Sequence, residues 1–207
     1  MNGFLKKLFI GPGLNDDPTP DLAIRTQKEY LKIIWDDNTY GVERLLRLFL
    51  FLIQFIFPVI YLRSVFRGLG KNYVKIIVEF YNMLKFIFPL LLLFLAWYQN
   101  KILIYINIYF MFETVFNILI IIFLSDIYSR SLSFQRSIIL LIMNYLQITT
   151  GFAVIYIGFD LLTPALTPLS ALYASFVTTA TLGYGDYLPR NSAGQTLSLI
   201  HISEPTR

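Results

Sequence analysis

The fold is decided by residues 167–189, which read TPLSALYASFVTTATLGYGDYLP. Thr167 offers a capping hydroxyl and Pro168 suits the first position of a helix, so the sequence predicts a helix that begins here and ends near Ala180. A helix of that length reaches roughly 18 Å, whereas the hydrocarbon core of a bilayer is about 30 Å thick. If such a helix lies at membrane depth, it must be surrounded by protein or line a cavity.

The composition of the whole chain is that of a membrane protein. Its 207 residues have a mean hydropathy of +0.61, and only 14% of them are charged, compared with about 25% in soluble domains. The chain has no cysteine and one histidine, His201, which excludes disulfide frameworks and thiolate chemistry and argues against an enzyme. The net charge is a modest +4, and most lysines and arginines fall in the membrane-flanking segments of residues 1–75, so we expect no nucleic-acid surface.

Four apolar segments precede the short helix. They cover residues 45–62, 80–98, 102–124 and 138–158. A helix needs about 20 residues to cross a bilayer, so the last three are expected to span it. The first contains Gln54 and Pro58 and is borderline, because it either spans the membrane or lies in the interface. The predicted fold class is an all-α integral membrane protein.

A glycine-rich hexad follows the short helix. It reads Thr181-Leu182-Gly183-Tyr184-Gly185-Asp186, and it resembles the selectivity filter of potassium channels, T-[VIL]-G-Y-G-D. Residues 171–180 look like the pore helix of that family, and residues 186–189 resemble its G-D-x-x-P exit motif. A dehydrated cation needs oxygens at fixed spacing, and backbone carbonyls provide them if the backbone alternates between left- and right-handed conformations. Gly183 and Gly185 tolerate the left-handed conformation because they lack a Cβ.

The resemblance implies a channel subunit with a re-entrant pore helix and filter loop, with K⁺ as the permeant ion and no cofactor. A ring of carbonyls needs four loops, so the expected assembly is a homotetramer. The residues expected to bind K⁺ through their carbonyls are Thr181, Leu182, Gly183 and Tyr184, and Gly185 completes the filter. The residues expected to support the filter are Asp186, Tyr173 and Phe176.

Two positions depart from the family pattern. The family often carries a Trp-Trp pair where this chain has Tyr173-Ala174, and Leu182 stands where Val is most common. Two alternatives to a potassium channel stay open. One is a weakly selective cation channel, and the other is a non-conducting membrane regulatory protein with a filter-like loop.

The sequence divides into four parts. Residues 1–44 form a cytoplasmic or interfacial segment, in which residues 22–35 are expected to be a membrane-surface helix or a small soluble cap helix. Residues 45–137 supply membrane helices, and residues 138–196 form the pore domain, which comprises an outer helix, the pore helix, the filter and the start of an inner helix. Residues 197–207 resemble the translation of a transposase-end adaptor from sequencing libraries, so we expect non-native read-through and a missing inner helix.

One acidic residue lies within the third apolar segment. Glu113 is expected to share a polar face of its helix with Asn107, Thr114 and Asn117. A carboxylate is costly in lipid, so Glu113 is interpreted either as a polar contact that holds the bundle together or as a gating or proton-sensing residue. Lys85, in the preceding segment, is its candidate partner.

Basic residues gather after the first apolar segment. Arg63, Arg67, Lys71 and Lys75 recur every fourth residue, but glycines interrupt them, so they do not indicate a voltage-sensing ladder. They are expected to contact anionic lipid. The positive-inside rule places this loop on the cytoplasmic side of a cell membrane, consistent with a multi-pass protein of a bacterial inner membrane, and leaves the side of the N-terminus open.

Overall fold

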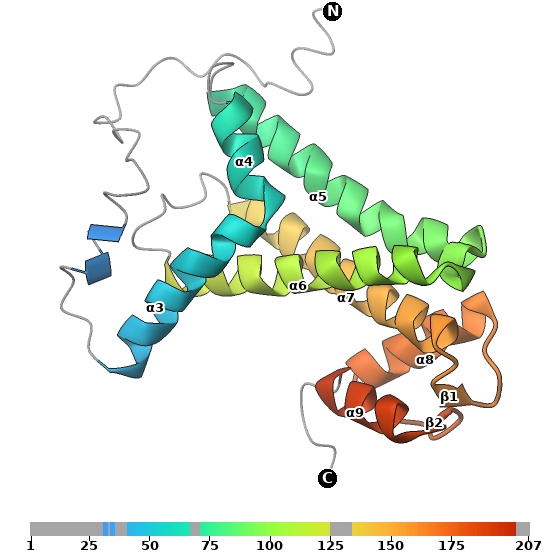
Figure 1. Ribbon diagram of the computed structural model, residues 1–207. Coiled ribbons are helices and arrows are strands. Elements are labelled where there is room, and N and C mark those ends of the chain that lie inside the picture. The colour runs from blue at the N-terminus through green and yellow to red at the C-terminus, as the bar shows by residue number, and fades with distance from the viewer. Residues whose placement is uncertain (1–30, 33, 36–40, 67–70, 125–133, 202–207) are drawn as a thin grey trace, which may run out of the picture. The chain divides into compact units, whose positions relative to one another are not determined.

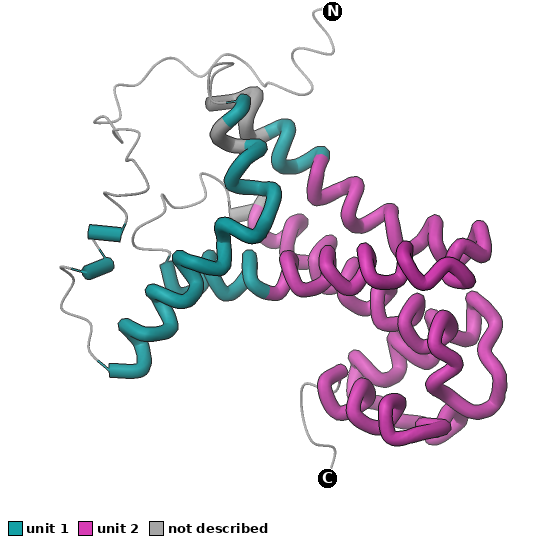
Figure 2. Tube along the Cα trace, viewed as in Figure 1, with its two compact units in different colours: residues 1–80, 116–130 teal, residues 81–115, 131–207 magenta. Residues whose placement is uncertain are grey.

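The computed structural model describes residues 31–32, 34–35, 41–66, 71–124 and 134–201 (Figure 1). The chain divides into two compact units (Figure 2). Unit 1 comprises residues 1–80 and 116–130, and unit 2 comprises residues 81–115 and 131–207. A surface helix was expected over residues 22–35, and most of that range lies outside the described residues. The four residues of the range that the structure describes, 31, 32, 34 and 35, are helical.

Three long apolar helices occur in the described residues. They are α5 (Lys71–Phe94), α6 (Lys101–Phe123) and α7 (Phe134–Gly158). Each contains a stretch long and apolar enough to cross a membrane, namely Ile76–Phe94, Lys101–Phe123 and Ser137–Gly158. The predicted fold class, an all-α membrane protein, is confirmed.

The second apolar segment differs from its prediction at both ends. Its helix begins at Lys71 rather than near residue 80, and it ends at Phe94 rather than at residue 98. Pro89 lies inside α5 without ending it, because a spanning helix tolerates a proline where neighbouring groups satisfy the freed carbonyl. The helix stops because Ala96 adopts a left-handed conformation with φ 55°, after which Trp97–Gln99 form the 3₁₀ helix η3.

The first apolar segment is broken. The helix α3 (Val42–Ile53) is followed by the 3₁₀ helix η1 (Gln54–Ile56) and then by α4 (Pro58–Val65). Phe57 is extended, with ψ 141°, as is typical of a residue that precedes proline, so the helix cannot continue through it. Neither α3 nor α4 has the roughly 20 residues needed to cross a bilayer, which favours the interpretation that this segment does not span as one helix.

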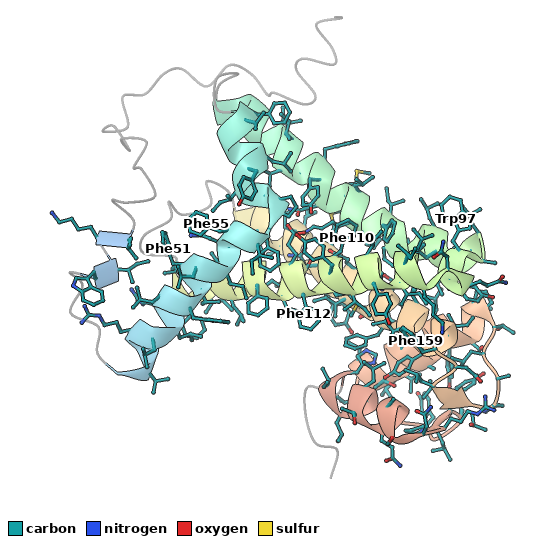
Figure 3. All side chains as sticks on the ribbon, viewed as in Figure 1. Phe51, Phe55, Trp97, Phe110, Phe112 and Phe159 are labelled. Atoms are coloured by element: carbon teal, nitrogen blue, oxygen red, sulfur yellow. The ribbon has the colours of Figure 1, made fainter. Side chains whose placement is uncertain are left out.

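Unit 1 has a small core with a strong aromatic content. Its buried residues are Ile34, Leu50, Phe51 and Leu124. Phe51 of α3 and Phe55 of η1 pack edge to face, with ring centroids 5.5 Å apart (Figure 3). Arg67 of the expected lipid-binding set lies outside the described residues, as do the side chains of Arg63, Lys71 and Lys75, so lipid contact there stays a prediction.

Unit 2 contains the stretch that decided the fold. After α7 come β1 (Leu162–Thr163), α8 (Pro168–Thr179), β2 (Leu188–Pro189) and α9 (Ser192–His201), and α8 packs against α7. The two strands pair antiparallel, with Leu162 opposite Pro189. The helix α9 continues past residue 196, and His201 within it is buried, so the backbone has no break where read-through was expected to begin.

The core of unit 2 holds α6 close to α7. Gly151 of α7 permits this approach, because a Cβ at Gly151 would lie only 2.5 Å from Met111 Sδ of α6. The buried apolar residues that form this core are Leu92, Leu93, Ile104, Met111, Phe152, Ala153, Val154, Ile155, Tyr156, Leu161, Leu162, Ala171 and Ala174.

Candidate functional site

The short helix α8 begins and ends where the sequence predicts. Thr167 is its N-cap, and its Oγ1 accepts a hydrogen bond from Ser170 N at 3.2 Å. Ser170 Oγ accepts in return from Thr167 N at 2.7 Å, which completes a capping box. Ala180 is the C-cap. These local contacts fix the start of α8 independently of the rest of the fold.

The backbone alternates in handedness through the hexad. Thr181, Gly183 and Gly185 have positive φ of 57°, 55° and 80°, whereas Leu182 and Tyr184 between them do not. The alternation at the two glycines is as predicted from the sequence. Thr181 was not predicted to be left-handed, although the two-residue spacing of the glycines, extended back by one step, leads to it. Its Cβ makes that conformation unfavourable by about 1–2 kcal/mol.

Backbone hydrogen bonds join the start of the loop to the end of α8. Thr181 N donates to the carbonyl of Thr178, and Leu182 N donates to that of Val177, each at 3.0 Å. The C-terminal end of α8, which carries a partial negative charge, therefore leads directly into the alternating segment. A cation in front of that segment would be stabilised by this end of the helix.

The far end of the loop is held by a tyrosine. Tyr173 Oη, on α8, donates a hydrogen bond to Asp186 Oδ2 at 2.7 Å. This bond raises the pKa of the Tyr173 hydroxyl above its ordinary value, because ionisation would place a second negative charge beside the carboxylate. Tyr173 also packs edge to face on Tyr187, with ring centroids 6.2 Å apart. Tyr173, which stands at the first position of the family's Trp-Trp pair, thus contacts the loop.

Two further positions of α8, Ala174 and Phe176, differ from Tyr173. Ala174, at the second aromatic position of the family, is buried in the core of unit 2. Phe176 is 38% exposed, and its support of the filter stays a prediction. A small pocket lies against the loop, and its lining includes Gly183, Gly185, Tyr173, Val177 and Tyr156.

The segment after the loop returns to the end of α7. Arg190 N donates to the carbonyl of Leu161 at 2.8 Å, next to the β1–β2 pair, and the Arg190 guanidinium pairs with the Asp160 carboxylate. Gly194 lies so close that a Cβ there would be 2.5 Å from the same Leu161 carbonyl. The exit of the loop is therefore fixed by backbone contacts that the sequence alone did not predict.

Comparison with known families identifies this region. The model of a family described as ion channels matches residues 139–203. Residues 139–203 are therefore similar to an ion channel domain. The matched residues run from α7 through α8 and the glycine-rich hexad into α9, and they extend past residue 196. No curated protein and no solved structure matched the chain.

The match confirms the resemblance stated from the hexad at the level of the family. The chain also has a buried charged pair outside the matched residues. Glu113 of α6 and Lys85 of α5 lie side by side, with Lys85 Nζ 3.7 Å from Glu113 Oε2 and each side chain 1% exposed. Thr114 and Asn107, predicted on the same polar face, are buried as well. Asn117 lies one turn further along α6, is half-buried and belongs to unit 1, outside this group.

Sequence reasoning missed two partners of the pair. Tyr81 Oη donates to Glu113 Oε2 at 2.6 Å, and Gln147 of α7 lies 3.0 Å from Thr114 Oγ1. Tyr81 lies four residues before Lys85, which places both on one face of α5, and this spacing was the available signal. Gln147 was visible as a polar residue in an apolar helix, but the sequence does not say which neighbour it faces.

Proposed function

We propose that the chain is a potassium-selective channel subunit that passes K⁺ between backbone carbonyls of four copies. The oxygens are those of Thr181, Leu182, Gly183 and Tyr184, and the Thr181 hydroxyl adds one more. The observation that carries the proposal is the alternation of φ at Thr181, Gly183 and Gly185, directly after a capped short helix in a channel-family segment. No cofactor takes part, and no enzymatic step is proposed.

The alternation supports carbonyl coordination for a geometric reason. In an ordinary strand or helix, successive carbonyls either alternate in direction or run along the axis. When left- and right-handed residues alternate, successive carbonyls instead turn toward the same side of the chain. A row of such oxygens can replace the hydration shell of K⁺ as the ion moves from one site to the next.

Four copies are proposed because one loop cannot surround an ion. One chain offers a single row of oxygens, whereas a hydrated cation gives up oxygens on all sides. Leu182 and Tyr184 are 56% and 62% exposed in the single chain, and neighbouring copies around the ion would bury them. The working unit is a homotetramer in a cell membrane.

Ion flux from the full-length channel in liposomes tests the proposal. A K⁺ gradient should produce flux, and the reversal potential under bi-ionic K⁺/Na⁺ conditions should lie close to that of a K⁺-selective pore. A reversal potential near zero would instead indicate a weakly selective cation channel. Absence of flux with every cation would indicate a non-conducting membrane protein.

The native C-terminal sequence is a separate part of the proposal. We propose that the native chain continues from about Gln195 into roughly 20 apolar residues that complete an inner helix. Sequencing the genomic DNA downstream of codon 196 tests it. A native stop codon shortly after Thr196 would contradict it.

A further inference from the structure

Four polar or charged side chains of unit 2 are buried, three of them on helices long and apolar enough to cross a membrane. Lys85 and Glu113 are each 1% exposed, while Gln147 of α7 and Ser175 of α8 are 2% and 0% exposed. Charges in hydrocarbon are costly and are retained where they pair or serve a function. Conduction through the filter loop does not account for any of these four side chains.

The two charges are held by further groups of α5 and α6. Lys85 Nζ donates to Thr114 Oγ1 at 3.3 Å, in addition to its contact with Glu113. Tyr81 Oη donates to Glu113 Oε2, and the Lys85 ammonium lies 5.0 Å from the centre of the Tyr81 ring. If either charge were removed, the other would be left buried without its counter-ion, so the pair fixes how α5 lies against α6.

Thr114 and Gln147 extend this network from α6 to α7. The Thr114 hydroxyl, which accepts from Lys85, lies 3.0 Å from Gln147 Oε1. Gln147 Nε2 donates to the carbonyl of Phe110 at 3.3 Å. Gln147 therefore contacts both a side chain and a backbone carbonyl of α6, which fixes the register between the two helices.

A single buried hydrogen bond continues from α7 to the short helix. Ser175 Oγ donates to the carbonyl of Thr149, two residues beyond Gln147, at 2.5 Å. The carbonyl of Ser175 accepts from Thr179 Oγ1 at 2.8 Å, one turn further along α8. From there the end of α8 is bonded to the filter loop. Side-chain hydrogen bonds, together with the backbone from Gln147 to Thr149 and the last turn of α8, thus connect the charged pair to the loop, and all of these residues lie in unit 2.

We infer that Lys85 and Glu113 are positioning residues for the filter, acting through Gln147 and Ser175 to hold the short helix α8. The inference rests on the proposed function. The pair governs how much of the time the filter conducts, whereas the carbonyls of the filter govern which ion passes.

The burial of Lys85 and Glu113 is explained better by a role in positioning the helices than by a role in stabilising the fold. A buried ion pair often contributes little or nothing to stability compared with well-packed apolar residues, although removing one partner alone is strongly destabilising. Its attested use is to specify one arrangement of helices over others. At this site the arrangement it specifies includes the hydrogen bond from Ser175 of α8 to the carbonyl of Thr149 of α7.

The test measures open probability and reversal potential together in the full-length channel in planar bilayers. Glu113→Gln and Ser175→Ala should each change open probability by roughly 2- to 30-fold while the K⁺/Na⁺ reversal potential stays at its wild-type value. The exchange Lys85→Glu with Glu113→Lys should return open probability toward wild type, because it restores the pair. Thr150→Val is the matched control, since Thr150 is also buried on α7 but its hydroxyl bonds only to carbonyls of its own helix.

Each outcome decides the inference. If Glu113→Gln and Ser175→Ala lower the thermal unfolding temperature but leave open probability as in Thr150→Val, the network is only structural and the inference is overturned. If Glu113→Gln does not fold, Ser175→Ala carries the test, because it removes one hydroxyl and no charge. A wild-type channel without K⁺ selectivity would refute the proposed function instead, and a change in its open probability by these variants would still support the positioning role.

Discussion

Replacing Gly183 with alanine tests whether backbone carbonyls set ion selectivity. Gly183 has φ 55°, and apart from its neighbours in the chain no atom of the described residues lies within 4 Å of the position that a Cβ would take. Within the described part of one chain the added methyl therefore meets no steric obstacle, and its effect there comes from the backbone conformation. Gly194 provides the contrast, because a Cβ there would collide with the carbonyl of Leu161.

The expected size of the effect follows from that conformation. A residue with a Cβ loses about 1–2 kcal/mol in the left-handed region. In a homotetramer the cost is about 4–8 kcal/mol, which shifts the balance toward a backbone with carbonyls turned away by roughly 10³- to 10⁶-fold. Gly183→Ala should therefore abolish conduction or collapse K⁺ over Na⁺ selectivity, while the helices α7 and α8 remain folded.

Reversal potentials under bi-ionic K⁺/Na⁺ conditions in the full-length channel measure this effect. Leu182→Val is the matched control, because it changes a side chain that is 56% exposed in the single chain and leaves the carbonyl in place. It should be nearly silent. If Gly183→Ala kept wild-type selectivity while Leu182→Val lost it, side chains would set the selectivity and carbonyl coordination would be wrong.

Three further variants test neighbouring contacts. Thr181→Ala removes only a hydroxyl, so the K⁺ dependence of the conductance should indicate weaker binding while the pore still conducts; loss of all current would contradict this. Tyr173→Phe removes the bond to Asp186 and should shorten open periods at pH 7. Because that bond raises the pKa of Tyr173, it is present below the ordinary value of about 10 and is lost only as pH rises through the raised pKa, so wild type should resemble the variant only at strongly alkaline pH. Gly151→Leu overpacks the contact with Met111 and should destabilise the protein by about 1–3 kcal/mol or more, seen as a lower thermal unfolding temperature in detergent; unchanged unfolding would show that α6 and α7 do not touch there.

The short helix was the part of the fold that the sequence predicted best. Its start depends on Thr167 and Pro168, and the loop that follows depends on Gly183 and Gly185, so every signal lies within a few residues of what it determines. The end of α5 was missed because it depends on one left-handed residue, Ala96, which no local pattern marks.

The buried polar contacts of Lys85, Glu113 and Gln147 were predicted less well, because they depend on residues far apart in the sequence. Glu113 was expected to have a polar or charged partner, and Lys85 was its candidate, because charges in lipid must be paired. Tyr81 and Gln147 were missed because they lie on other helices, 32 and 33 residues from the residues of α6 that they contact, and only packing decides which helix faces meet. The role of Ser175 could not be read from its helix either, since serine there is equally compatible with solvent.

The pairing of β1 with β2 gives residues 162–189 one further property. Leu162 and Pro189 lie opposite one another, so the chain leaves the end of α7 and comes back to the same place after the helix and loop. Residues 162–189 thereby form a cassette whose two ends meet at one place, while α8 within it also packs against α7. Chimeras that exchange this cassette between related channels, cut at the two paired residues, would transfer helix, loop and both closing strands together and leave the junctions in the recipient at an unchanged separation.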